Sequence, residues 1–235
     1  LFVLILFPVS LFSYEKSICG PTDERQLSQN TRSGRVYQND GESVCTVTLI
    51  GRKCAISAAH CRWTLNSVEF NTPLSRGGRM SHSDPQDIYK IDEDSIYFHN
   101  NGPGDDFAVM KLEENEITGL LPGDALGNYE VSFEAPKVGD VVRITGHGRD
   151  ARESRNFAQQ THAAPIARLY QSTIQHVADT KFGNSGSSIV DETTQKVIGI
   201  HTHGACYSSG GANYGTLFYG HIRLRQAIRN CLASE

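Results

Sequence analysis

The sequence predicts an all-β fold, a sandwich or a barrel, with one helix near its C-terminal end. Short segments rich in Val, Ile, Thr, Tyr and Phe recur along the 235 residues, and turn-forming residues separate them. These side chains suit a pleated, half-buried surface, so the pattern indicates many short strands. Helical periodicity is convincing only close to the C-terminal end.

The expected strands follow one another at short intervals. They cover residues 45–51, 53–57, 67–71, 95–99, 107–112, 141–146, 187–190, 197–202 and 214–219. Residues 113–136 contain two prolines and few strand signals, so we expect a linker between two β halves. The helix is expected over about residues 221–233, where Ile222, Leu224 and Ile228 fall on one apolar stripe.

The chain opens with an almost wholly apolar segment, residues 1–13. A helix needs about 20 apolar residues to span a bilayer, so we expect no stable membrane anchor. The segment matches the apolar core of a secretory signal, and we expect residues 1–16 to be a signal peptide truncated at its start. The folded domain would then cover residues 17–235, in a protein secreted to the extracellular or periplasmic space.

The net charge and the cysteine content indicate which partners and which cellular compartment to expect. The net charge is −4, and no basic stripe appears, so we expect no nucleic-acid partner. The six cysteines form an even set in a chain that we expect to be exported, which favours disulfides over free thiols. Their pairing is left open by the count alone.

Three short motifs carry candidate catalytic residues. CAISAAHC, residues 54–61, runs from an apolar strand into His60. GDDFAVMKL, residues 104–112, places Asp106 directly before an apolar run, with Asp105 as the competing candidate. DTKFGNSGSS, residues 179–188, sets Ser185 among glycines that permit a tight turn. Each motif alone is more often structural, as a packed histidine or a turn residue.

The three motifs together indicate nucleophilic catalysis. A hydroxyl becomes an effective nucleophile when a neighbouring imidazole accepts its proton, and a buried carboxylate fixes the tautomer of that imidazole. His60, Asp106 and Ser185 occur in the order His–Asp–Ser. This is the chymotrypsin order, and it differs from the order in α/β-hydrolases and subtilisins.

The segments around these residues resemble a known family. AISAAHC resembles the TAAHC box of chymotrypsin-like serine proteases, DFAVMKL resembles their DIALLKL, and GNSGSSIV resembles their GDSGGPLV. Within that superfamily the chain is most similar to the bacterial glutamyl endopeptidases of the staphylococcal and Bacillus type. Those proteins carry GNSGSP or GQSGSP and IGIH or VHTNG, close to GNSGSS at 183–188 and IGIHTHG at 198–204.

The resemblance implies a fold of two six-stranded antiparallel β-barrels with a C-terminal α-helix. The N-terminal barrel would cover about residues 30–115 and the C-terminal barrel about 137–220, in one trypsin-like serine peptidase domain. The triad would lie in the cleft between the barrels. The resemblance also implies a protease that acts on protein or peptide substrates without a cofactor, and we expect a monomer.

The roles of the site residues follow from the same resemblance. Ser185 would attack the scissile carbonyl, His60 would act as general base and then general acid, and Asp106 would orient it. The N–H groups of Gly183 and Ser185 would form the oxyanion hole. Residues Thr202, His203 and Gly204 would run beside the substrate backbone as an edge strand.

Substrate preference is open between two hypotheses. Thr180 and His201 match the pair that binds the substrate carboxylate in glutamyl endopeptidases, which implies cleavage after Glu or Asp. Asp179 aligns instead with the carboxylate that selects Arg or Lys in trypsin. We favour cleavage after the acidic residue, because the imidazole of His201 would crowd a long basic side chain. A catalytically silent, protease-like binding module is a minor alternative.

The cysteines and two histidines of the C-terminal half lead to expectations about disulfides and metal binding. The spacing of Cys45 and Cys61 is that of the disulfide enclosing the catalytic histidine in this superfamily. For the remaining cysteines we favour Cys54 with Cys231, which would tie the histidine strand to the terminal helix, and by elimination Cys19 with Cys206. His201 and His203 could share one strand face as metal ligands, but no third ligand has a recognisable spacing, so we expect no metal site.

Overall fold

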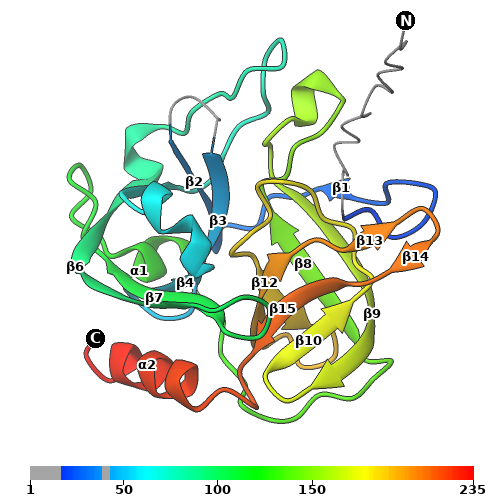
Figure 1. The fold of residues 1–235 in the computed structure, drawn as a ribbon. Helices are drawn as coiled ribbons and strands as arrows, with labels where there is room; N and C mark the ends of the chain where they lie inside the picture. Colours follow the sequence, from blue (N-terminus) through cyan, green and yellow to red (C-terminus); the bar gives the residue numbers. More distant parts are fainter. Residues whose placement is uncertain (1–16, 39–42) are drawn as a thin grey trace, which may run out of the picture.

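The computed structural model describes residues 17–38 and 43–235, and the expected signal peptide lies outside the described residues. Two antiparallel β-barrels lie side by side, and helix α2 (Ile222–Leu232) ends the chain (Figure 1). The predicted fold class, two six-stranded antiparallel barrels with a C-terminal helix, is confirmed.

The first barrel closes in the order β2-β3-β4-β7-β6-β5. Its strands are β2 (Ser33–Gln38), β3 (Ser43–Leu49), β4 (Cys54–Ser57), β5 (Ser67–Glu69), β6 (Ile88–Asn100) and β7 (Asp106–Leu112). The pairing of Arg35 with Glu69 joins β2 to β5 and closes the ring. The short 3-10 helices η2 (Ala59–Thr64) and η3 (Pro85–Asp87) connect these strands. Strand β2 was not predicted, because few residues of its sequence SGRVYQ favour a strand.

The second barrel follows the order β9-β10-β15-β12-β11-β8, and β8 pairs with β9 to close it. Its strands are β8 (Val141–Gly146), β9 (Gln160–Tyr170), β10 (Thr173–His176), β11 (Ser188–Asp191), β12 (Val197–His203) and β15 (Asn213–Leu217). Strand β1 (Gln26–Leu27) adds to β9, and β13 (Cys206–Tyr207) pairs with β14 (Gly210–Gly211). A 3-10 helix, η4 (Glu153–Arg155), precedes β9, and neither β9 nor β10 was predicted.

The segment between the barrels contains the short helix α1 (Pro122–Leu126). Helix α2 follows the second barrel in the chain but packs back on β7 and β4 of the first one (Figure 1). Its buried residues are Leu224, Ile228 and Cys231, whereas Ile222, which we also expected on the apolar stripe, is 81% exposed because it lies at the first position of the helix. Within the described part of the chain, no helix is both long and apolar enough to cross a membrane.

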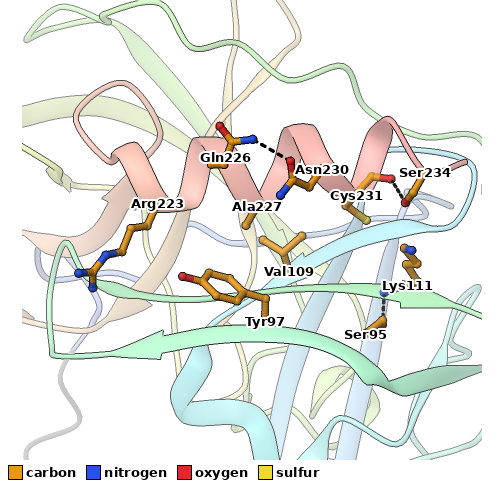
Figure 2. A pocket seen from close by; sticks show the side chains of 10 residues that line it. All are labelled: Ser95, Tyr97, Val109, Lys111, Arg223, Gln226, Ala227, Asn230, Cys231 and Ser234. Carbon is orange, nitrogen blue, oxygen red and sulfur yellow. Dashed lines mark hydrogen bonds between the residues drawn. The ribbon is translucent and has the colours of Figure 1, made fainter.

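A pocket of about 460 Å³ lies between α2 and the strands β6 and β7 (Figure 2). Tyr97 and Val109 supply its apolar floor, and Gln226 and Asn230 of the helix bond to each other across its rim at 2.7 Å. None of the predicted catalytic or binding residues is among those that line it. The predicted site residues therefore lie outside this pocket.

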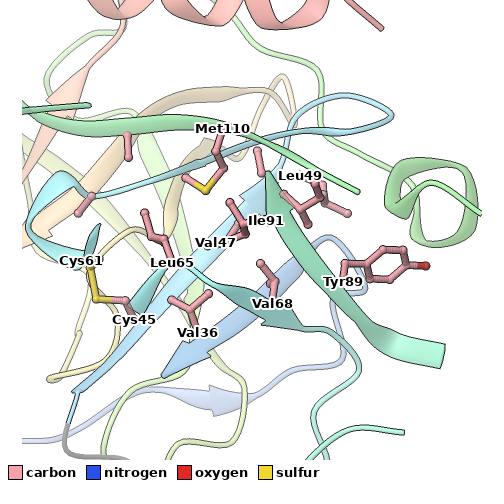
Figure 3. Close-up of a cluster of buried hydrophobic side chains, with 14 of the residues drawn as sticks. Val36, Cys45, Val47, Leu49, Cys61, Leu65, Val68, Tyr89, Ile91 and Met110 are labelled. Atoms are coloured by element: carbon pink, nitrogen blue, oxygen red, sulfur yellow. A yellow bond between two sulfur atoms is a disulfide. The ribbon is translucent and has the colours of Figure 1, made fainter. Parts of the chain in front are cut away.

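The interior of the first barrel is an apolar cluster next to a disulfide (Figure 3). Val36, Val47, Leu65 and Met110 are buried there, each at most 2 % exposed. The charged side chain of Arg35 is also fully buried: it donates to Glu69 Oε2 at 2.6 Å and to Phe157 O at 3.0 Å. Because Phe157 belongs to the second half of the chain, this arginine ties the two barrels together.

Candidate active site

An imidazole and a carboxylate pair at the edge of the first barrel. His60 follows β4 in η2, and Asp106 is the first residue of β7, the strand that pairs with β4. His60 Nδ1 lies 2.5 Å from Asp106 Oδ2, and Asp106 Oδ1 accepts the N–H groups of Ala59 at 2.7 Å and His60 at 3.2 Å. Asp106 is 0 % exposed. The carboxylate is therefore anchored on one oxygen and directed at the imidazole with the other.

The neighbouring carboxylate, Asp105, points away from this pair. Its Oδ1 accepts hydrogen bonds from His99 Nδ1 and His221 Nε2, both at 2.8 Å. Burial raises the pKa of Asp105, but hydrogen bonds from His221, Asn101 and His99 outweigh it and hold the pKa below the usual value. Of the two aspartates that the sequence left in competition, Asp106 is the one in contact with His60.

The loop that carries Ser185 is fixed from both sides. Ser185 O accepts from Thr46 N at 2.8 Å in the first barrel, and Gly186 N donates to His201 O at 2.9 Å in the second. Gly183 and Gly186 have φ of 103° and 89°, in the left-handed region that favours glycine. Among the described residues, the N–H groups of Gly183 and Ser185 have no hydrogen-bond acceptor.

The hydroxyl of Ser185 donates to Thr202 O at 3.3 Å. No hydrogen bond joins it to His60 in the described part of the chain. The serine loop nevertheless borders the histidine, because Ser185 O lies 3.8 Å from Sγ of Cys61. Catalytic hydrogen bonds are often long or absent before substrate binds, so this arrangement is compatible with a serine nucleophile.

The carboxylate of Asp179 is occupied by the N-terminal segment. Oδ1 accepts from Cys19 N at 2.7 Å, and Oδ2 accepts from Glu24 N at 2.8 Å. Nδ1 of His162 lies 3.5 Å from Oδ2, and Asp179 as a whole is 2 % exposed. Its charge therefore faces protein backbone.

Thr180, next in the chain, has a different environment. Its backbone N–H donates to Ser17 O at 3.0 Å, and the residue is 0 % exposed. Within the described residues, its hydroxyl is buried without a hydrogen-bond partner. A buried polar atom without a partner is costly and is often a site for a ligand or water.

Behind His201 lies a second buried imidazole that the sequence analysis missed. His176 Nε2 is 3.2 Å from His201 Nδ1, and the two rings meet edge to face. Burial lowers the pKa of His176 to about 3 and lowers that of His201 well below its ordinary value. Both rings are therefore neutral at neutral pH. A histidine in the short segment TIQH carries no distinctive signal, so only the folded structure pairs it with His201.

His203 belongs to a different cluster from His201. A register shift separates the two residues where β12 pairs with β15, so the simple alternation expected along the strand does not hold. His203 Nδ1 is 2.9 Å from Thr202 Oγ1 and 3.9 Å from Asp106 Oδ2, and its ring centroid is 5.5 Å from that of His60. Gly204 follows directly after β12.

Three disulfides join different segments of the chain. Cys45–Cys61 joins β3 to η2 beside His60, Cys54–Cys231 joins β4 to α2, and Cys19–Cys206 joins the N-terminal segment to β13. No cysteine is free. These are the pairs that the sequence analysis favoured.

The comparisons place the chain in a family. A family model described as Trypsin matches residues 22–228, so the chain belongs to the trypsin family of serine proteases. Over 218 residues it is 26% identical to a glutamyl endopeptidase of Bacillus licheniformis, a match that covers 86% of this chain. The chain spans 65% of the length of that relative.

Solved structures support the same fold. A Glu endopeptidase in complex with MPD matches with a TM-score of 0.71 at 21% identity, over 92% of this chain and 99% of that chain. The protease Anisep from Arthrobacter nicotinovorans matches with a TM-score of 0.64 at 17% identity, over 90% of this chain and 100% of that chain. The thermostable serine protease AL20, from an extremophilic microorganism, has a TM-score of 0.67 at 14% identity, over 88% and 99% of the two chains.

Proposed function

We propose that the chain is a secreted serine endopeptidase in which Ser185, His60 and Asp106 form the catalytic triad. The observation that carries the proposal is the buried carboxylate of Asp106, 2.5 Å from His60 Nδ1. Because the carboxylate accepts a hydrogen bond from Nδ1–H, the lone pair of the neutral ring is on Nε2, where a general base needs it. Membership of the trypsin family supports the same assignment.

The proposed reaction begins with the hydroxyl of Ser185. Rotation of this side chain away from Thr202 O would bring the hydroxyl to His60 Nε2, which accepts its proton as Oγ attacks the scissile carbonyl. The carbonyl oxygen becomes an oxyanion, and the free N–H groups of Gly183 and Ser185 would stabilise it. Each such donor contributes about 2.7–4 kcal/mol in a related case. His60 then protonates the leaving amine, and water releases the acyl group by the same steps.

Labelling with a fluorophosphonate probe tests the proposed nucleophile. We expect the mature protein to be labelled, and we expect Ser185→Ala to abolish the labelling. His60→Ala should slow it strongly, because the general base is lost. His82→Gln is a matched control, since His82 also pairs with a carboxylate, that of Glu69 at 2.8 Å, but is not one of the predicted site residues. An unlabelled wild type, or labelling that persists in Ser185→Ala, would favour the silent binding module.

We further propose that the enzyme cleaves after Glu or Asp. The carboxylate of Asp179 already accepts two backbone N–H groups, which argues against its use for a substrate Arg or Lys. The unpartnered hydroxyl of Thr180 is a free donor for a substrate carboxylate. The curated and structural relatives named as glutamyl endopeptidases also support this preference.

His176 explains how a neutral His201 could serve as the second donor. If the Nε2–H of His176 donates to His201 Nδ1, the proton of His201 must be on Nε2, where it can be donated to a ligand. A neutral ring also avoids the cost of a buried charge without a counter-charge. His176 is thus proposed as a positioning residue for His201.

Peptides that differ only in the residue before the scissile bond test the preference. We expect kcat/KM to be highest for Glu, lower for Gln and lowest for Lys. His201→Ala should lower turnover of the Glu peptide far more than turnover of the Gln peptide, because it removes a contact to the charge. A preference for Lys in the wild type would overturn the assignment of the pocket.

Secretion and oligomeric state belong to the same proposal. Three disulfides and no free cysteine among the described residues favour an oxidising compartment. Protein and peptide substrates are the proposed partners, and a monomeric state remains a prediction.

A further inference from the structure

His203 brings a third ligand atom to the pair formed by His60 and Asp106. Its Nδ1 lies 3.9 Å from Asp106 Oδ2, and its ring is 5.5 Å, centre to centre, from that of His60. Within the described part of the chain, two groups of His, Cys, Asp or Glu side chains bring three ligand atoms within 4.8 Å of one another, and this is one of them. The other contains Cys45 and Cys61, whose sulfurs are joined in a disulfide.

Two imidazoles and one carboxylate form a ligand set typical of zinc. Zinc bonds imidazole nitrogen at about 2.0–2.1 Å and carboxylate oxygen at about 2.0–2.2 Å, in a tetrahedron with water at an open position. Ligand atoms on one such ion lie roughly 3.3 Å apart by that geometry. For zinc to bind, the distance from His203 Nδ1 to Asp106 Oδ2 would shorten from 3.9 Å by about half an ångström. The distance from His60 Nδ1 to Asp106 Oδ2 would lengthen from 2.5 Å.

The site is both anchored and accessible. Ala59 N and His60 N bond Asp106 Oδ1, so Oδ2 can bind a metal while the carboxylate stays in place. The side chains of His60 and His203 are 34% and 39% exposed, so an ion can reach them from solvent.

We propose that His60, Asp106 and His203 form a zinc site through which zinc reversibly inhibits the enzyme. Zinc would bind His60 Nδ1 in place of the ring proton that hydrogen-bonds to Asp106. That proton leaves, and the neutral ring takes one from solvent on Nε2, so no net proton is gained or lost. With a proton on Nε2, His60 has no lone pair with which to accept the proton of Ser185.

The ligand set explains why the sequence predicted no metal site. His201 and His203 are two residues apart, but His201 bonds His176 and lies outside the cluster. The two other ligands come from distant parts of the chain. In the glutamyl endopeptidase motif VHTNG, the position of His203 is occupied by Asn, so His203→Asn is a substitution that the fold should tolerate.

Direct zinc binding tests the site without any need for catalysis. The mature Ser185→Ala protein, which cannot digest itself, is titrated with zinc against a chromophoric chelator. We expect one equivalent to bind, and we expect His203→Asn in the same background to bind at least about tenfold more weakly. His60→Ala should also weaken binding, whereas His82→Gln should not. No binding, or equal binding by the His203→Asn protein, would overturn the inference.

The inhibitory consequence rests on the proposed role of His60, so it has a separate measurement. Zinc should slow fluorophosphonate labelling of the wild type, and a chelator should restore the rate. In the His203→Asn variant, compared with its own rate without zinc, the same zinc concentration should have little effect. Absence of labelling without zinc would defeat the proposed function, whereas labelling that zinc never slows would defeat only this inference.

Discussion

The substitution Asp179→Asn tests whether this carboxylate holds the N-terminal segment or selects a substrate Arg or Lys. In the structure, its two oxygens accept Cys19 N at 2.7 Å and Glu24 N at 2.8 Å. Asparagine keeps one acceptor and turns an NH₂ group toward the other donor. A hydrogen bond to a charged group contributes about 1.5–3 kcal/mol, so we expect the free energy of unfolding to fall by about 2–3 kcal/mol. For a chain of this size, the melting temperature should fall by about 4–12 °C.

The assay combines stability with substrate preference. Thermal unfolding gives the stability loss, and kcat/KM for the Glu, Gln and Lys peptides gives the preference, which should keep its wild-type order. Asp191→Asn is a matched control: Asp191 Oδ1 alone accepts Thr193 N and Thr194 N, so an amide oxygen can retain both bonds. A variant with wild-type stability and a selective loss of cleavage after Lys would refute the reasoning.

Three further predictions concern stability and the serine loop. Glu69→Gln should lower the free energy of unfolding by about 3–5 kcal/mol, because it leaves Arg35 buried without a counter-charge; an unchanged urea midpoint would contradict this. Burial lowers the pKa of His176 to about 3, whereas the unfolded ring has a pKa of about 6.5. The unfolded chain thus binds more protons, so the stability that comes from keeping His176 neutral is fully present above about pH 6.5 and declines toward pH 3. Between these pH values the urea midpoint of His176→Gln should therefore depend less on pH than that of the wild type. An equal dependence on pH in the two proteins would refute the low pKa of His176. Gly186→Ala should abolish fluorophosphonate labelling. Gly186 has a φ of 89°, and a Cβ added there would meet a backbone oxygen of β3 at 2.1 Å. Normal labelling of this variant would disprove the need for glycine.

Gly139→Ala is the control for the last prediction. Gly139 also has a positive φ, of 94°, but an added Cβ would meet nothing within 4 Å. Its backbone strain is therefore comparable, while the steric conflict with β3 is absent. We expect this variant to lose some stability and to retain labelling.

The strands that the sequence predicted are those with local β character. Runs such as 141–146 coincide with the observed strand β8, because Val and Ile dominate them. β9 was missed because QTHAAPIARLY contains alanines and a proline, and β10 because it is only four residues long. Those segments become strands because they pair with neighbours on both sides that close the second barrel.

The sequence by itself determined the strand-rich class, the His–Asp–Ser order and the family, because these depend on local composition and on short motifs. Only the tertiary structure decided what each side chain contacts. It directed Asp106 at His60 and Asp105 at His99, it bonded Asp179 to the N-terminal segment, and it paired His201 with His176. The physical reason is that hydrogen-bond partners and burial come from segments that lie far apart in the chain and meet only when the barrels close.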